Sequence, residues 1–218
     1  MPDTRIPSFV RHRTRLTEGQ QHAWDQWWSE YGGEVAETDR LDVTPPTVLE
    51  IGSGNGEATA LMAAAAPSVH HVAVEVYEPG LAHLLIRLRA AELANLRLLR
   101  GDAVDLLERA VPESSLEGIR IFFPDPWPKR RHHKRRLVQP DFVALAASRL
   151  RPGGWLHLAT DWAHYADQML AVCEACPALT RAPESDPWYP RPDSRPLTKF
   201  EQRAVREGRI VRDLLYTA

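Results

Sequence analysis

Residues 47–56 read TVLEIGSGNG, an apolar β-strand segment that runs directly into a glycine-rich turn. The segment before the turn is apolar or β-branched apart from one glutamate, which is typical of a strand buried in a parallel sheet. Gly52, Gly54 and Gly56 permit a tight turn in which the backbone approaches a ligand closely. With the alanine-rich helix predicted at 57–66, this stretch indicates a cofactor-binding α/β domain.

Strand and helix patterns alternate on the C-terminal side of this unit. Further strands are predicted at 71–76, 96–100, 119–123, 155–160 and 210–216. Helices are predicted at 79–93, 104–110, 140–150, 161–175 and 198–207, and a proline-rich loop at 183–196. This alternation predicts an α/β fold with a parallel, doubly wound sheet.

The first 45 residues differ from the rest and are predicted to be an N-terminal basic arm and a helix, attached to one domain that spans 46–218. Arginines are concentrated in residues 1–16, and a capping-box pattern at Thr17 and Gln20 then predicts a helix start. Aromatic residues follow at helical spacing, and we expect them to pack against the domain. The arginines are Arg5, Arg11, Arg13 and Arg15, and the aromatic residues are Trp24, Trp27, Trp28 and Tyr31.

Composition limits the possible classes of protein. The chain has 218 residues, of which 44% are hydrophobic, enough for one ordinary core. Its net charge of -2 excludes a uniformly basic nucleic-acid coat, so any polyanion must bind a local patch. No signal peptide and no long apolar run appear, so we expect a cytoplasmic protein without a membrane span. Cys173 and Cys176 lack nearby partner ligands, so reduced thiols and no metal site are expected.

A carboxylate stands at the C-terminal end of each predicted parallel strand. Ligands of open α/β sheets bind at these ends, so the pocket should be anionic. Glu57 occupies the place of the third glycine of a dinucleotide fingerprint, where its charge would oppose a pyrophosphate. S-adenosylmethionine, a cation without phosphate, suits such a pocket, with Glu75 placed for the ribose hydroxyls and Asp102 for the adenine amine. The five acids are Glu50, Glu75, Asp102, Asp125 and Asp161.

Residues 122–136 read FFPDPWPKRRHHKRR. Asp125 lies between two prolines, which hold the backbone extended and prevent a helix. Six of the eight residues at 129–136 are Lys or Arg, and the other two are His. Such a run repels itself unless a polyanion offsets it, so the pattern predicts a phosphate-binding track beside a carboxylate. Trp127 either stacks on a base or packs under the turn, and the sequence leaves both open.

Together these motifs resemble the tRNA (guanine-N7-)-methyltransferase family over nearly the whole chain. The segments PDPWPK and TKFE are specific to it, whereas the glycine turn is common among methyltransferases. The matching motifs lie at 8–11, 15–20, 50–56, 74–76, 101–103, 123–129, 131–136, 160–162 and 198–201.

The resemblance implies a class I S-adenosylmethionine-dependent methyltransferase fold, with a Rossmann-like doubly wound sheet. The implied reaction moves a methyl group to N7 of guanine 46 in the variable loop of tRNA. The implied cofactor-binding residues are Glu50, Gly52, Glu75, Asp102 and Asp125, of which Asp125 is also catalytic. The implied substrate-binding residues are Lys129, Asp161, Thr198, Lys199, Phe200 and Glu201, and the implied RNA-binding residues are Arg131, His132, His133, Lys134, Arg135 and Arg136.

The chemistry of guanine N7 limits what the protein must supply. N7 has a lone pair and no proton, so we expect alignment of the reactants and no general base. We expect Asp125 to stabilise the positive charge that develops on the base and to accept hydrogen bonds from guanine N1–H and N2–H. Two alternatives stay open: methylation of another tRNA or rRNA base, and a non-catalytic RNA-binding protein of methyltransferase fold. A monomer and a homodimer are both compatible with the sequence.

Overall fold

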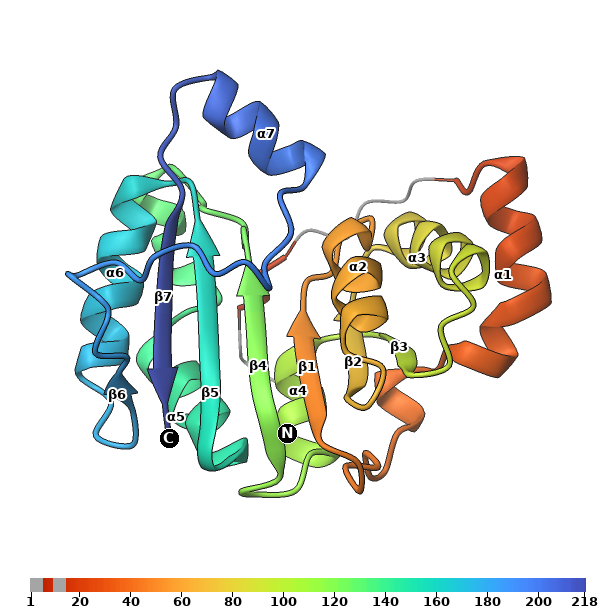
Figure 1. The fold of residues 1–218 in the computed structure, drawn as a ribbon, viewed down its shortest axis with the longest axis horizontal. Helices are drawn as coiled ribbons and strands as arrows, with labels where there is room; N and C mark the ends of the chain where they lie inside the picture. Colours follow the sequence, from red (N-terminus) through yellow and green to blue (C-terminus); the bar gives the residue numbers. More distant parts are fainter. Residues whose placement is uncertain (1–5, 10–14) are drawn as a thin grey trace.

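A computed structural model describes residues 6–9 and 15–218 of the chain, so the predictions for Arg5, Arg11 and Arg13 lie outside the described residues. The structure is a seven-stranded sheet in the order β3-β2-β1-β4-β5-β7-β6, with helices on both faces (Figure 1). The predicted α/β class and doubly wound arrangement are confirmed.

The elements follow the predicted alternation closely. The strands are β1 Thr47–Ile51, β2 His70–Glu75, β3 Leu96–Arg100, β4 Leu116–Phe122, β5 Leu150–Thr160, β6 Thr180–Arg181 and β7 Arg212–Thr217. The α-helices are α1 Glu18–Tyr31, α2 Glu57–Ala65, α3 Glu78–Ala90, α4 Ala103–Arg109, α5 Pro140–Arg149, α6 Ala163–Glu174 and α7 Lys199–Arg206, and the short 3₁₀ helices are η1 Val35–Glu37 and η2 Arg130–Arg135. The sequence patterns did not predict β6 or the 3₁₀ helices.

The expectation of an entirely parallel sheet is wrong at one edge. Strands β1 to β5 are parallel, but β7 pairs antiparallel with both β5 and β6. The reason is the path of the chain: after β6 it crosses in front of the sheet and forms α7 beyond the C-terminal ends of the parallel strands (Figure 1). A strand that starts from that end must run back through the sheet in the opposite direction.

The two faces of the sheet differ in polarity. Successive residues of a strand point to opposite faces, and Leu49 and Ile51 of β1 belong to the apolar core that includes residues of α4, α5 and α6. Glu50 therefore points to the other face. Its cross-strand neighbour is Arg120 of β4, which in turn neighbours His157 of β5. A row of ionisable groups thus crosses the middle of the sheet on the face opposite this core.

Helix α1 packs its aromatic residues against the domain, as predicted. Thr17 and Gln20 form the expected capping box at its start. Trp24 and Trp28 stack with ring centroids 4.0 Å apart, and both pack against a core cluster that includes residues of α3. The α1 aromatics therefore contribute to stability through burial.

No helix in the described part of the chain is long and apolar enough to cross a membrane. Cys173 and Cys176 are free and buried, and burial raises the pKa of the Cys173 thiol to about 12. A thiol with so high a pKa is a weak nucleophile at neutral pH.

Candidate active site

The glycine turn after β1 has the backbone conformation that its sequence requires. Gly52, Gly54 and Gly56 have φ angles of 80°, 53° and 69°, in the left-handed region that residues with a Cβ rarely adopt. A Cβ on Gly52 or Gly54 would meet no other atom within 4 Å, because both face open space. The turn therefore presents bare backbone to whatever occupies the neighbouring cavity.

Glu75, at the end of β2, fixes this turn. One carboxylate oxygen accepts a hydrogen bond from Gly54 N at 3.0 Å. The other accepts from Val76 N at 2.7 Å and Tyr77 N at 2.9 Å. Asp102 has a related role at the next strand end, where it caps α4 by accepting from Val104 N at 2.9 Å. Both acids thus hold the loops that surround the ligand space.

A cavity of about 330 Å³ lies at the C-terminal ends of the strands. Three of the predicted acids line it, and none of the described lining residues is Lys or Arg, so the cavity suits a cationic ligand. Among the described residues, no group of three or more His, Cys, Asp or Glu is placed to hold a metal ion. The lining includes Gly52, Gly54, Glu75, Asp102, Phe122, Phe123, Asp125 and Leu137.

Asp125 lies at the rim of this cavity on a strained turn. Phe123 and Trp127, on either side of it, have positive φ angles of 52° and 44°. Such angles are unfavourable for aromatic residues and persist only where the surrounding structure enforces them. The turn therefore holds Asp125 between the cavity and the basic segment at 129–136.

Trp127 packs under the turn in this structure, which answers the question that the sequence left open. Its indole N–H donates to the backbone oxygen of Ser8 at 2.9 Å. The guanidinium of Arg135 lies 4.0 Å from the ring centroid and donates to the backbone oxygen of Phe9 at 3.1 Å. Trp127 and Arg135 thus join the described part of the N-terminal arm to the Asp125 turn.

The predicted RNA track divides into outward and inward side chains. Lys129, Arg131 and Lys134 are exposed, together with Arg130, which had not been singled out. Arg136 differs from these cations, because it is only 2% exposed, and a direct contact of its side chain with RNA stays a prediction.

The guanidinium of Arg136 is held inside the protein. It donates to the backbone oxygen of Pro126 at 2.8 Å and to Gln168 Oε1 at 2.6 Å, and it lies over the ring of Tyr165. This arginine therefore fastens the basic segment to α6, and the outward cations are the ones available to phosphates.

His132 and His133 carry less charge than the arginines beside them. Partial burial and then the neighbouring cations lower the pKa of each imidazole. Both are therefore mostly neutral near pH 7. We retain them as contacts in the predicted RNA track but attribute its positive field to the Lys and Arg side chains.

The substrate-binding predictions converge around α7. Thr198 caps this helix, accepting from Glu201 N at 3.2 Å, and Lys199 N donates to Glu57 Oε2 at 3.1 Å. Phe200 is 53% exposed, and its ring centroid lies 5.0 Å from that of Phe123. These contacts bring the TKFE segment to the Asp125 turn.

Two predicted substrate acids have partners within the protein. Glu201 is 2% exposed, and Arg195 binds its carboxylate. Asp161 forms an ion pair with Arg209 at 2.6 Å. Any role of either acid in substrate binding therefore stays a prediction.

Glu50 is placed differently from the other cofactor predictions, since it is not among the residues that line the cavity. It is 5% exposed and lies beside Arg120 on the polar sheet face. Burial raises the pKa of Glu50, whereas the positive charge of Arg120 acts to lower it. A direct contact between Glu50 and a cofactor stays a prediction.

We expect Glu75→Gln to weaken cofactor binding by about tenfold or more, because an amide nitrogen cannot accept the hydrogen bonds that one carboxylate oxygen now receives. Calorimetric titration with S-adenosylhomocysteine measures the affinity. Glu92→Gln, at an exposed site, is the control and should bind as the wild type does. Unchanged affinity in Glu75→Gln would contradict the proposed role of this residue.

The fold and the anionic cavity define an α/β methyltransferase. A family model described as "Putative methyltransferase" matches residues 44–214. The chain is 47% identical to the tRNA (guanine-N(7)-)-methyltransferase of Alkalilimnicola ehrlichii, covering 97% of this chain and 92% of that one. It is 48% identical to that of Halorhodospira halophila, covering 96% and 93%. The chain belongs to the tRNA (guanine-N7-)-methyltransferase family.

Solved structures support the fold. The aminoglycoside resistance methyltransferase NpmB1 has a TM-score of 0.50 at 17% identity, covering 94% of this chain and 95% of that chain. A predicted O-methyltransferase, Atu636 of Agrobacterium tumefaciens, has a TM-score of 0.50 at 18% identity, covering 84% and 77%. At such identities the likeness concerns the arrangement of elements alone.

Proposed function

We propose that this protein transfers the methyl group of S-adenosylmethionine to N7 of guanine 46 in the variable loop of tRNA. The observation that carries the proposal is the position of Asp125, at the boundary between an anionic cavity and an exposed cationic segment. The anionic cavity suits a cationic cofactor, and the exposed cationic segment suits a polyanion such as RNA. Full-length relatives named tRNA (guanine-N(7)-)-methyltransferase support the choice of base.

The residues present fit the cofactor. S-adenosylmethionine, when bound, supplies an electrophilic methyl group on a positively charged sulfur. The acids Glu75 and Asp102 would accept hydrogen bonds from its ribose and adenine, and their negative charge favours its cationic end. Gly52 and Gly54 add no side chain to the cavity wall at the glycine turn.

Asp125 acts on the base and not on a proton. Because N7 has no proton, its attack on the methyl group that the cofactor would supply needs no general base. Positive charge moves onto the guanine during this step, and the Asp125 carboxylate stabilises it. The same carboxylate would accept N1–H and N2–H, a pattern that adenine does not present.

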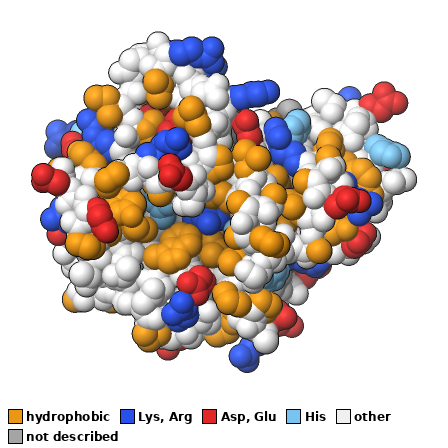
Figure 2. Space-filling model, viewed as in Figure 1, with side chains coloured by type: hydrophobic (Ala, Val, Ile, Leu, Met, Phe, Trp, Pro, Cys, Tyr) orange, Lys and Arg blue, Asp and Glu red, His pale blue; other side chains and the backbone are white. Residues whose placement is uncertain are grey.

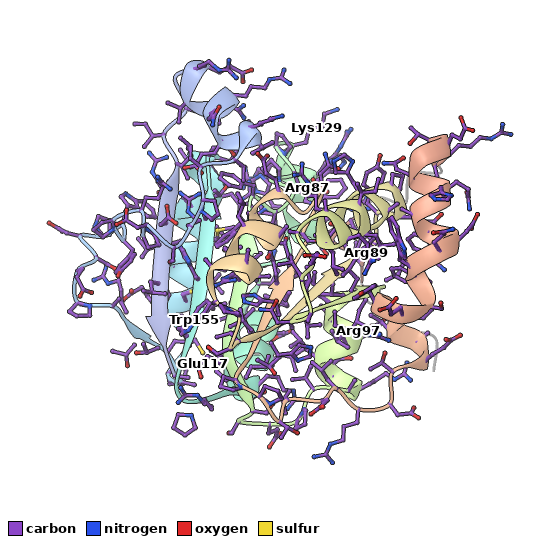
Figure 3. All side chains as sticks on the ribbon, turned by 45° about the vertical axis from the view of Figure 1, so that its right-hand side comes forward. Arg87, Arg89, Arg97, Glu117, Lys129 and Trp155 are labelled. Carbon is purple, nitrogen blue, oxygen red and sulfur yellow. The ribbon has the colours of Figure 1, made fainter. Side chains whose placement is uncertain are left out.

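The exposed cations would hold the tRNA. Lys129, Arg130, Arg131 and Lys134 face solvent next to the Asp125 turn. Figure 3 shows Lys129 toward the end of the sheet where α7 stands. Since tRNA is the proposed substrate, we place the activity in the cytoplasm. A monomer and a homodimer are both compatible with this proposal.

Methylation of an unmodified tRNA transcript with labelled S-adenosylmethionine, followed by chemical cleavage at N7-methylguanosine, tests the proposal. We expect one labelled position, in the variable loop, and no product when guanine 46 is replaced by adenine. Label on another base would support a different RNA methyltransferase. Absence of cofactor binding would indicate a non-catalytic RNA-binding protein.

A further inference from the structure

Arg195 is a buried cation that the proposed reaction does not use. It is 2% exposed and lies in the proline-rich segment that crosses the polar face of the sheet. Its guanidinium donates to Asp213 of β7 at 2.7 and 2.9 Å, and to Glu201 of α7 at 2.5 and 2.9 Å. Each carboxylate is bound through both of its oxygens, the geometry that only a guanidinium provides.

Helix α7 depends on this contact for its position. It has eight residues, too few to be stable alone, so tertiary contacts must hold it. Its only buried residues are Glu201 and Ala204, and the rest of the helix projects beyond the strands (Figure 1). The Arg195–Glu201 pair is therefore the main polar anchor of α7 to the sheet.

The first turn of α7 touches two parts of the proposed active site. Lys199 N donates to Glu57, directly after the glycine turn, and Phe200 packs on Phe123, two residues before Asp125. Arg195 itself lies 5.8 Å from the ring centroid of Phe123. A shift of Arg195 would therefore move both the TKFE segment and the strained start of the Asp125 turn.

Asp213 is itself held in place from the sheet. His157 Nε2 lies 2.7 Å from Asp213 Oδ1, and both side chains are buried. Burial lowers the pKa of His157 more than the adjacent carboxylate raises it, so the imidazole is neutral at pH 7. The negative charges of Asp213 and Glu201 thus both act on Arg195, which burial alone would destabilise.

We infer that Arg195 is a positioning residue that fixes the first turn of α7 and the Asp125 turn for methyl transfer. The inference rests on the proposed function, because it assigns Arg195 a role in that reaction. The effect of Arg195 should appear mainly in the placement of the guanine and hence in turnover, because the exposed cations proposed to bind phosphates belong to a different segment. We call the group Arg195, Glu201 and Asp213 the arginine clasp.

The test is Arg195→Lys, which keeps the charge but cannot bind two carboxylates bidentately. We expect kcat per cofactor-binding site to fall by about tenfold or more, with KM for tRNA within about threefold of wild type. Glu201→Gln should lower kcat similarly. The double variant should lose no more than the worse single variant, because the two residues act through one contact.

Hydrogen exchange gives a readout that does not depend on catalysis. In Arg195→Lys the amides of α7 should exchange about tenfold faster or more, while those of β1 to β4 stay unchanged. The matched control is Arg151→Lys, whose ion pair with Glu117 at 2.7 Å lies at the opposite end of the sheet, where Figure 3 labels Glu117. It should leave kcat and the exchange of α7 unchanged.

Wild-type kcat in Arg195→Lys would overturn the inference, and so would a loss of kcat without faster exchange in α7. If wild-type protein fails to methylate tRNA, the proposed function fails. The exchange of α7 then still shows whether the arginine clasp holds the helix, so the two failures are distinguishable.

Discussion

Replacing Asp125 with asparagine is expected to lower kcat for tRNA methylation by about 10²- to 10³-fold, the usual cost of removing one preorganised electrostatic partner of a transition state. Asparagine keeps the size of the side chain and the turn between two prolines, but it removes the negative charge. Positive charge that develops on guanine then has no carboxylate beside it. Single-turnover methylation with saturating tRNA measures the effect, and circular dichroism verifies the fold.

The control is Asp167→Asn, which removes an exposed carboxylate from α6 and should retain full activity. Because Asp125 also lines the cavity, S-adenosylhomocysteine affinity is measured in the same variant. A weaker affinity for the cofactor would not by itself explain a loss of kcat that persists when the cofactor is saturating. Turnover within about threefold of wild type in Asp125→Asn would show that this carboxylate is not catalytic.

A triple variant that replaces Arg130, Arg131 and Lys134 with glutamine is expected to bind tRNA about 10- to 100-fold more weakly. The dependence of log affinity on log salt should become shallower by about 2 to 3, since each phosphate contact contributes about 0.7 to 0.9 to this slope. Arg135 and Arg136 are left in place because they hold the segment to the protein. Filter binding between low and moderate salt measures both quantities.

The control is a second triple variant that removes the same charge from exposed or half-exposed positions elsewhere. It combines Arg109→Gln, Arg151→Gln and Arg181→Gln. It should change the salt slope little, because these residues lie at the opposite end of the sheet. Equal slopes in the two triple variants would show that net charge, and not the basic segment, governs tRNA binding.

The fold was predictable where local pattern determines it. The glycine turn and the strand–helix alternation identified β1 to β5 and their helices. The direction of β7 was not predictable, because it depends on α7 lying beyond the strand ends. The sequence predicts that β4 begins at residue 119, whereas the strand begins at Leu116, because Gly118 interrupts the apolar pattern. A Cβ there would lie 2.3 Å from Trp155, so the glycine makes room for that side chain.

The candidate site was predictable where the ends of parallel strands bring residues together. Glu75, Asp102 and Asp125 line one cavity for this reason. Glu50 is not among the residues that line this cavity and lies beside Arg120 of β4. Arg136 resembles its neighbours in sequence, and only packing against residues of α6 distinguishes it. Arg195 and Asp213 meet through a loop and an antiparallel strand, and no spacing rule connects them.

The position of β7 has a consequence for synthesis on the ribosome. Every other element of the site is made before β7, yet β7 lies between β5 and β6 and contributes Asp213 to the arginine clasp. A nascent chain that has emerged only as far as α7 can form β1 to β5 and the cavity, because these elements precede it. Such a chain cannot yet hold α7 against the sheet, because Arg195 can bind Glu201 of α7 but Asp213 of β7 has not yet been made. The glycine turn and the cavity can therefore form on the ribosome before the arginine clasp does.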